Sequence, residues 1–419
     1  MLVATSVATD ARVLKEARTL VGAGHRVHII GKSVPTDYEP PPGITVSSVG
    51  ASSVLRREGA ASLSRKQLPP HVRFARWAML PTHRNSTFAR WARGAVQQAA
   101  GIDADVVHAH DFTALAAGHE IATAKGVPLV YDTHELWSGR SREYRPTPLQ
   151  DRRELAAEKR LGDHAAAVIT VGDGIADTLR RRNGWSHVRV VRNTFERPAD
   201  PVDPGDPVGS GDPVDSGEGE PLPPRPTGLI YAGRLGAHRE LETVAAASGA
   251  IRADLGLTTR LMGPADGTWL AGFDPGACEV LPPCPPDDVD AHLREAGLVL
   301  VALAPGFENH RLALPNKLFH AAAAGVPVVA TDLGELAAVV REHGIGTTYR
   351  AGDARDLQRA VAAAVADYPA LCAAVAAAAD ALSWTRDAGV LLDLYERLAP
   401  AVRRETDHSA PVTGRRSGS

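Results

Sequence analysis

The stretch from residue 298 to residue 332 contains two short apolar runs with a helix-forming segment between them. Leu298 to Leu303 and Val326 to Ala330 are apolar runs with β-branched residues, which predicts two buried strands. Pro315 suits the first turn of the intervening helix, and Gly325 suits the left-handed cap that ends it. A strand, a helix and a strand in this order join two parallel strands. They also aim the helix N-terminus at the carboxyl edge of the sheet, where open α/β proteins bind ligands.

The start of this helix is suited to anion binding, because a helix N-terminus carries partial positive charge and free N–H donors. Asn316 and Lys317 lie beside it, and Arg234 and Arg239 follow another predicted strand at residues 228 to 232. Arginine binds phosphate oxygens with a planar fork, and lysine acts as a compact charge. The three cations together predict a clamp for a departing diphosphate, although any one of them alone is equally explained as a solvated loop charge.

The chain of 419 residues is longer than one hydrophobic core usually supports, so two domains are expected. Its opening alternates a strand, a helix capped by Asp10 and a second strand, which predicts a doubly wound parallel sheet. Residues 197 to 227 are dominated by Pro, Gly, Asp and Ser, a composition typical of an extended linker. The predicted divisions are an N-terminal domain at 1–196, a disordered linker at 197–227, a C-terminal domain at 228–383, a helix at 384–400 and a disordered tail at 401–419.

Composition narrows the class of protein further. The formal net charge of -3 gives no overall attraction to nucleic acid. The three cysteines, Cys278, Cys284 and Cys372, fit neither a disulfide framework nor the close pairs of zinc sites. The N-terminus lacks a basic segment followed by a long apolar stretch, and no run approaches the roughly 20 apolar residues that span a bilayer. We therefore expect a cytoplasmic protein with reduced thiols.

Residues 51 to 93 form a basic segment with nine Lys or Arg and one acidic residue, Glu58. The pentapeptide FARWA occurs twice, at residues 74–78 and 88–92, and places Phe and Trp three residues apart on one helical face. One interpretation is peripheral contact with an anionic membrane or an anionic acceptor. The alternative is a pair of solvated helices whose rings pack on the core while their arginines extend along the surface.

Polar residues follow two predicted strands of the N-terminal half. The strand at 104–109 leads into HAHD and the strand at 128–132 leads into THELW, so both are expected to deliver side chains to one sheet edge. The residues concerned are His108, His110, Asp111, Asp132, His134 and Glu135. Two histidines on one strand face can begin a zinc site, but the spacing fixes no third ligand. We therefore favour a structural or acceptor-contacting role and predict no metal site.

In order along the chain, these and other segments resemble the retaining GT-B glycosyltransferases of family 4, in the branch with a PNK signature. The likeness covers most of the chain, and its segments are TDARVLKEARTLVGAGHRVHII, ADVVHAHD, LVYDTHELW, AAVITVGDGIADTL, YAGRL, ALPNKLF, AAGVPVV and SWTRDAGVLLDLYERL. The resemblance implies an α/β fold of GT-B type, with two Rossmann-like doubly wound domains facing an interdomain cleft. It also implies a nucleotide-sugar donor, with a UDP-sugar favoured, held mainly by the second domain. The acceptor is then a glycan, a lipid-linked compound or a small molecule held by the first domain, and the transfer retains configuration without a metal or cofactor.

The candidate site combines residues that match the family's motifs with residues expected at the same strand ends and loops. The catalytic set is His134, Arg234, Arg239 and Lys317; the donor-binding set is Gly233, Asn316, His320 and Glu308; the acceptor-binding set is His110, Asp111, Asp132 and Glu135. One departure concerns the pair of glutamates, eight residues apart, that the family usually carries. In this chain His320 occupies the place of the ribose-binding glutamate, and Leu312 precedes it by eight. Glu308 is a substitute carboxylate from the preceding loop.

We therefore expect a retaining hexosyltransferase that moves a sugar from a nucleotide diphosphate to a hydroxyl. In this mechanism the leaving phosphate takes the acceptor proton, so no protein base is needed. Two alternatives stay open: a nucleotide-sugar epimerase on the same two-domain plan, which needs no acceptor, and a catalytically silent GT-B subunit that binds a partner transferase.

Overall fold

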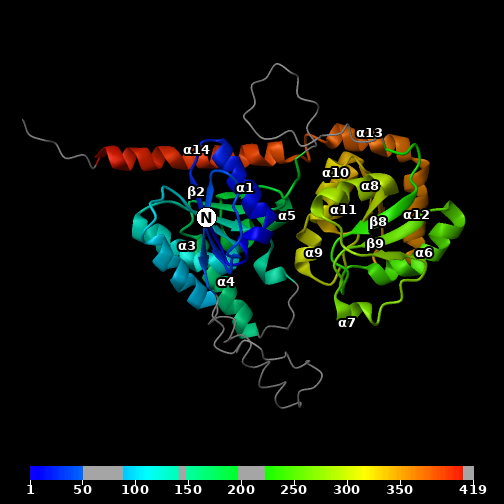
Figure 1. Cartoon of the computed structure of the whole chain (residues 1–419), viewed down its shortest axis with the longest axis horizontal. Helices are drawn as coiled ribbons and strands as arrows, with labels where there is room; N and C mark the ends of the chain where they lie inside the picture. Colours follow the sequence, from blue (N-terminus) through cyan, green and yellow to red (C-terminus); the bar gives the residue numbers. More distant parts are fainter. Residues whose placement is uncertain (51–87, 141–147, 197–221, 409–419) are drawn as a thin grey trace, which may run out of the picture. The chain divides into compact units, whose positions relative to one another are not determined.

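The computed structural model describes residues 1–50, 88–140, 148–196 and 222–408, and the chain forms two compact units, each built on one parallel sheet (Figure 1). The N-terminal unit comprises Met1–Thr170, Thr178–Val191 and Ala388–Ser419. The C-terminal unit comprises Val171–Asp177 and Arg192–Asp387. Most of the basic segment, most of the predicted linker and the last eleven residues of the predicted tail (51–87, 197–221 and 409–419) lie outside the described residues.

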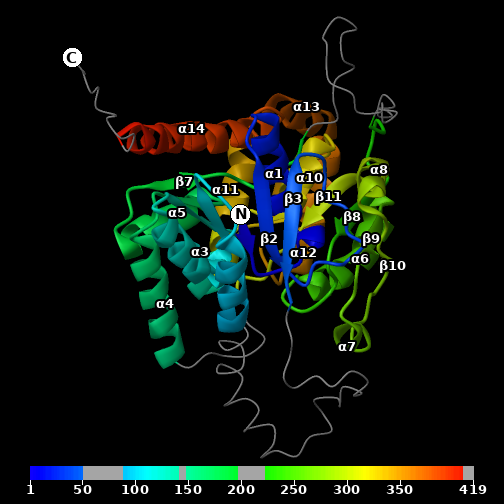
Figure 2. The ribbon, with the colours of Figure 1, turned by 60° about the vertical axis from the view of Figure 1, so that its left-hand side comes forward.

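The N-terminal unit contains a seven-stranded sheet in the order β3-β2-β1-β4-β5-β6-β7, with every neighbouring pair parallel. Its strands are β1 (Leu2–Val3), β2 (Val27–Lys32), β3 (Ile44–Val49), β4 (Val107–His110), β5 (Leu129–Thr133), β6 (Ala167–Thr170) and β7 (Val188–Val190). The order reverses between β1 and β4, and this topological switch point is where doubly wound sheets bind ligands, at the carboxyl ends of the strands. Figure 2 shows β2 and β3 side by side with α1 next to them.

Helices flank this sheet because each carries an apolar face. They are η1 (Val7–Thr9), α1 (Ala11–Gly22), a helix at residues 88–99, α3 (Asp111–Lys125), η3 (Trp137–Gly139), α4 (Pro148–Gly162), and most of α5 (Asp173–Asn183) and α14 (Trp384–His408). Asp10 caps α1 by accepting a hydrogen bond from the Val13 amide at 3.2 Å, as predicted. In the described copy of FARWA, Trp91 is buried, which agrees with rings that pack on the core.

The C-terminal unit contains a six-stranded parallel sheet in the order β10-β9-β8-β11-β12-β13. Its strands are β8 (Gly228–Ala232), β9 (Thr258–Met262), β10 (Glu279–Leu281), β11 (Gly297–Val301), β12 (Val328–Thr331) and β13 (Gly346–Tyr349). Its helices are α6 (Leu241–Leu255), α7 (Gly267–Leu270), η4 (Pro286–Asp288), α8 (Val289–Ala296), α9 (Glu308–Leu312), α10 (Asn316–Ala323), α11 (Gly334–His343), α12 (Ala354–Ala366) and α13 (Tyr368–Ala378). The order reverses between β8 and β11, so the switch point of this sheet lies beside Gly233 and the loop before α9.

Two apolar clusters cover the two faces of the second sheet. One unites β-strand side chains with residues of α6 and α12, and the other unites them with residues of α8, α10, α11 and α13. The buried strands read as continuous apolar runs because both faces of a parallel sheet are covered by helices. The predicted unit of strand, helix and strand is confirmed as β11, α10 and β12, with Gly325 at φ 75° after the helix.

Some boundaries differ from the prediction. The final helix continues to His408, past the expected end at residue 400, so the first part of the predicted tail is helical. Neither β3 nor β13 was assigned from the pattern, because short sheet strands with polar residues lack a strong apolar period.

No individual helix among the described residues has both the length and the apolar composition of a membrane span. The pair α12 and α13 meets the length and composition criteria only when joined, and it is bent by 82°.

Candidate active site

Polar side chains gather at the carboxyl ends of β4 and β5, beside the switch point of the first sheet. His110 lies opposite Asp132 in the parallel register of the two strands. Both are completely buried, whereas the side chains of His134 and Asp111 keep 20% and 26% of their exposure. The structure therefore brings four predicted residues together but leaves only His134 and Asp111 accessible to a bound molecule.

Asp132 is the centre of this group. Arg12 donates to both of its oxygens, from Nε to Oδ2 at 2.9 Å and from Nη2 to Oδ1 at 3.0 Å. The ring atoms His110 Nδ1 and His134 Nε2 each lie 3.2 Å from Oδ2. Burial raises the pKa of Asp132, but the positive charges of Arg12 and His134 outweigh it and hold the pKa well below its usual range. The carboxylate is therefore ionised, and it orients its neighbours rather than facing solvent.

His134 lies between two carboxylates. Its Nδ1 is 3.4 Å from Asp111 Oδ2, and its Nε2 contacts Asp132. Burial lowers the pKa of His134, but Asp111 and Asp132 outweigh it and raise the pKa to about 9. At neutral pH the ring is a cation that donates hydrogen bonds and has no lone pair with which to act as a base. Asp111 has φ 62°, a left-handed conformation that is uncommon for non-glycine residues and recurs at functional sites.

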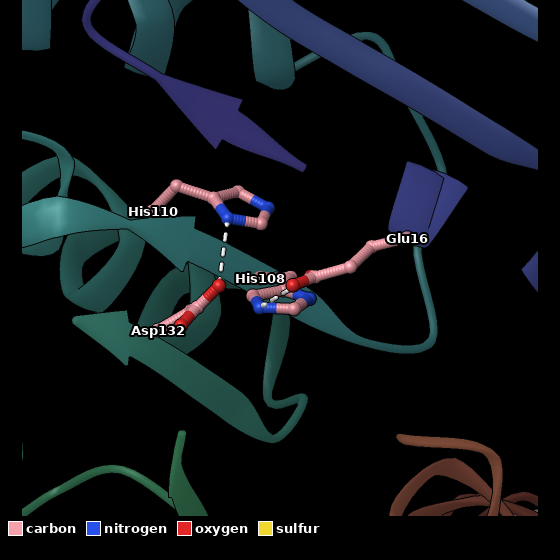
Figure 3. A group of neighbouring side chains, drawn as sticks. All are labelled: Glu16, His108, His110 and Asp132. Carbon is pink, nitrogen blue, oxygen red and sulfur yellow. Dashed lines mark hydrogen bonds and ion pairs between the residues drawn. The ribbon is translucent and has the colours of Figure 1, made fainter. Parts of the chain in front are cut away.

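A second buried group adjoins the first on β4 and α1, and Figure 3 shows its Glu16 and His108 beside His110 and Asp132 of the first group. His108 Nδ1 is 2.9 Å from the Tyr395 hydroxyl, and His108 Nε2 is 3.8 Å from Glu16 Oε2. Glu16 Oε1 is 3.0 Å from Arg12 Nε. Burial raises the pKa of Glu16 to about 8 and holds the pKa of His108 well below its usual range.

Sequence reasoning missed Arg12, Glu16 and Tyr395. A signal was present for two of them, because Arg12 and Glu16 recur at the spacing of Val13, Ala17 and Leu20 and share the buried face of α1. Charged residues on an apolar helix face indicate a buried partner. Nothing in the pattern connects Tyr395 to His108, which is 287 residues away.

Glu135, which was predicted to bind acceptor, pairs with Arg140 at 3.7 Å. Its backbone carbonyl accepts the Thr133 hydroxyl at 2.7 Å. These contacts show Glu135 fixed within its own turn.

In the C-terminal unit, Lys317 on α10 lies against the end of β8. A Cβ atom added to Gly233 would be 2.6 Å from Lys317 Cε and 2.8 Å from its Nζ, so only glycine leaves this space. Nζ also lies 4.6 Å from the centre of the Tyr231 ring. Burial and the nearby charge of Arg239 lower the pKa of Lys317 to about 8. No carboxylate pairs with this ammonium group among the described residues.

The loop after β8 carries the two predicted arginines. Arg234 is exposed and Arg239 is half-exposed, and within the described part of the chain neither side chain forms an ion pair or hydrogen bond. His238 and Glu240 flank Arg239 with φ values of 65° and 57°, so the loop is held in left-handed conformations. Arg239 thus lies near Lys317 and His310, and no carboxylate of the described residues, the adjacent Glu240 included, forms an ion pair with it.

His310 is a further residue near Arg239 that sequence reasoning missed. Its Nδ1 is 2.7 Å from the Ala304 carbonyl, which fixes the proton on Nδ1 and leaves Nε2 as an acceptor. Burial, together with the charges of Arg239 and His238, lowers the pKa of His310, so the ring is neutral. The ring of Phe307 packs edge-on against both His238 and His310.

The other predicted donor residues have specific partners. His320 Nε2 is 2.7 Å from Asp290 Oδ1, and its ring stacks on Phe195 at 4.6 Å. Asn316 accepts a hydrogen bond from the Asn193 side chain at 3.0 Å. Glu308 is the exposed first residue of α9.

Two protein-family models match the two halves of the chain. Residues 9–194 match the family model described as a glycosyl transferase 4-like domain, and residues 226–367 match the model described as glycosyl transferases group 1. No curated protein sequence matches the chain.

Solved structures give the fold. Sucrose-phosphate synthase from Thermosynechococcus elongatus is 17% identical, with a TM-score of 0.67 over 96% of this chain and 99% of that chain. HepE from Anabaena in complex with UDP is 14% identical, with a TM-score of 0.62 over 95% and 99%. A UDP-forming trehalose-phosphate synthase from Burkholderia vietnamiensis is 12% identical, with a TM-score of 0.57 over 96% and 99%.

Two Rossmann-like units with these matches define a glycosyltransferase of the GT-B fold. Within that class, the chain belongs to the family of glycosyl transferases group 1 with a 4-like N-terminal domain, as the sequence resemblance predicted.

Proposed function

We propose that the protein transfers a hexose from a nucleotide-diphosphate sugar, a UDP-sugar in preference, to a hydroxyl acceptor with retention of configuration. The observation that carries this proposal is the pair of neighbouring cations Arg239 and Lys317, which have no carboxylate partner among the described residues. Like charges that share a partly buried site destabilise each other until an anion compensates them. A diphosphate offers that compensation with several oxygens, and HepE in the structures compared above holds UDP.

The basic side chains stabilise the leaving group in this proposal. As the bond from sugar to phosphate breaks, negative charge grows on the diphosphate oxygens. Arg234, Arg239 and Lys317, together with the amide N–H groups at the start of α10, then interact more strongly with the transition state than with the ground state. These side chains supply the positive charge that a divalent cation supplies elsewhere, so we propose a transfer that needs no metal ion.

The acceptor proton passes to an oxygen of the leaving phosphate. This step suits the N-terminal unit, because His134 is protonated at neutral pH and is not a base. His134 provides positive charge and Asp111 accepts hydrogen bonds from hydroxyl groups of the acceptor or the sugar. His110 and Asp132 are buried, so they act as positioning residues for His134, and Glu135 fixes the following turn. The acceptor class is a glycan, a lipid-linked compound or a small molecule.

The remaining donor contacts come from α9 and α10. Gly233 allows Lys317 to approach β8, and Asn316 stands at the start of α10. Glu308, exposed at the start of α9, offers a carboxylate to the ribose hydroxyls. Asp290 occupies one ring nitrogen of His320, so the ring offers Nδ1 alone to a ribose.

Nucleotide titration of Arg239→Ala tests the proposal. UDP is expected to raise the melting temperature of the wild-type protein, since a ligand bound only to the native state stabilises it. Arg239→Ala and Arg234→Ala should keep the fold and lose this shift and the turnover of UDP-sugar. A variant of either arginine that turns over donor at the wild-type rate removes that residue from the site.

A catalytically silent subunit is the second candidate, and the pairing of His320 with Asp290 favours it. The two candidates differ in donor chemistry. Hydrolysis or transfer of the donor supports the transferase, whereas a folded protein that binds neither UDP nor GDP supports the silent subunit.

A further inference from the structure

Four potential metal ligands converge inside the N-terminal unit. Glu16 comes from α1, His108 and His110 from β4, and Asp132 from β5 (Figure 3). One ligand atom of each residue lies within 4.8 Å of those of the other three, and all four residues are buried. This cluster is outside the basic residues proposed to bind the donor, which belong to the C-terminal unit.

Both histidines are held through one ring nitrogen. A carboxylate can only accept, so the Nδ1 proton of His110 points at Asp132 and leaves a lone pair on Nε2. His108 Nδ1 is fixed by the Tyr395 hydroxyl at 2.9 Å. The two rings stack with centroids 4.2 Å apart. Imidazoles that bind metal ions have this arrangement, in which an outer hydrogen bond orients the ring and leaves the other nitrogen for the ion.

Four atoms of the cluster lack hydrogen-bond partners, and a metal ion bound to them displaces the proton that Glu16 holds at neutral pH. His108 Nε2, His110 Nε2 and both Glu16 oxygens are buried and have no hydrogen-bond partner within the described residues. Arg12 lies within ion-pair distance of Glu16 Oε1, but Oε2 faces His108 Nε2 at 3.8 Å. Buried polar atoms without partners are costly, and a cation or a water molecule bound between them removes that cost.

We propose that His108 Nε2, His110 Nε2 and the Glu16 carboxylate bind one divalent transition-metal ion of the zinc type. Two imidazoles and a carboxylate suit Zn²⁺ better than Mg²⁺ or Ca²⁺, which prefer ligand sets made of oxygen. Asp132 remains with Arg12 and orients His110 from outside. Zinc bonds to nitrogen and oxygen are about 2.0–2.2 Å long, so binding draws α1 toward β4.

The ion has a structural role in this proposal. It joins α1 to the central strand of the sheet and takes no direct part in the transfer chemistry. The inference does not depend on the proposed function, because a protein that transferred no sugar would have the same ligands.

Zinc binding to the tag-free full-length chain tests the inference. The protein is stripped with a chelator, dialysed and titrated with Zn²⁺ by calorimetry, and bound zinc is counted by mass spectrometry. We expect one zinc ion per chain and a raised melting temperature. Glu16→Gln should abolish both effects, because a neutral amide is a poor ligand. The matched control is Glu342→Gln, an exposed position on α11 that should bind zinc as the wild type does.

Tyr395→Phe keeps the inference testable if Glu16→Gln does not fold. Loss of the hydroxyl that orients His108 should weaken zinc binding by about 10- to 100-fold while the three ligands remain. Two results overturn the inference. One is a folded wild-type protein that binds no stoichiometric zinc, which means that water fills the cluster. The other is binding that is equal in the wild type, Glu16→Gln and Tyr395→Phe, which places the ion elsewhere.

Discussion

The ammonium group of Lys317 lies 4.6 Å from the centre of the Tyr231 ring, in a space that exists only because residue 233 has no side chain. The aromatic face gives the cation a weak attractive contact, but no carboxylate among the described residues neutralises it. The partly buried ammonium group of Lys317 is therefore an uncompensated charge beside Arg239. We expect the binding of an anion to relieve this repulsion.

Gly233→Ala should disrupt this arrangement. The new Cβ meets Lys317, and the φ of 148° is strained for any residue with a side chain. We expect a loss of stability of about 1–3 kcal/mol and a displaced lysine. UDP affinity, measured by calorimetry, should fall by about tenfold or more, the equivalent of roughly 1.4 kcal/mol. Gly249→Ala is the control, because Gly249 lies within α6 with no atom near the added Cβ. That change should leave binding intact.

UDP binding should weaken as pH rises through 8. Lys317 has a pKa of about 8 in the folded protein, so its charge is lost above that value while the arginines stay charged. The lowered pKa of Lys317 also affects the stability of the folded protein, which changes with pH in the direction opposite to UDP affinity. The unfolded chain binds more protons between pH 8 and its ordinary lysine pKa, so the nucleotide-free protein gains stability across that window.

Lys317→Arg supplies the comparison for this pH profile. Arginine stays protonated, so any UDP binding that the variant retains should not decline between pH 7.5 and 9.5. A wild-type affinity that is constant over the same range contradicts the assignment of Lys317 to the phosphate site.

Arg12→Met should destabilise the N-terminal unit strongly. It leaves the buried carboxylate of Asp132 without its two-pronged partner, and breaking a buried pair in this way costs about 3–5 kcal/mol. Urea denaturation of the purified protein measures the change. Arg18→Met, at an exposed position of the same helix, should change stability little. Adding Asp132→Asn to Arg12→Met should restore part of the loss, because no unpaired charge then remains.

His134→Ala should separate catalysis from donor binding. His134 belongs to the N-terminal unit, and the proposed phosphate ligands belong to the C-terminal unit. We expect kcat to fall by about 10²-fold or more, as for removal of one stabilising donor, with UDP affinity unchanged. The exposed His164 gives the control His164→Ala, which should keep full turnover. Equal turnover in both variants excludes His134 from the reaction.

The local sequence determined where helices begin and end and which segments form strands, because these features depend on residues close together in the chain. Asp10 predicted the start of α1, and Gly325 the left-handed end of α10, because caps act within a single turn. The apolar runs predicted β8 and β11, and strand alternation with helices predicted two doubly wound sheets. The approach of Lys317 to the end of β8 was also predictable, because parallel strands carry their following loops to one edge.

Tertiary structure decided which polar residues are buried and what they pair with. A residue at the end of a strand can face solvent and bind a ligand, or it can be buried and pair with several neighbours. Packing by α1 and α14 makes Asp132 and His108 inaccessible. Glu16 and Tyr395 approach His108 on β4, and Arg12 binds Asp132 on β5, all from distant parts of the chain. The helical period marks Arg12 and Glu16 as buried, but it does not identify these partners. The partner of His320 was hidden for the same reason, because Asp290 reaches it from another helix. Sequence patterns report contacts a few residues apart, whereas desolvation and long-range pairing are set by the folded chain as a whole.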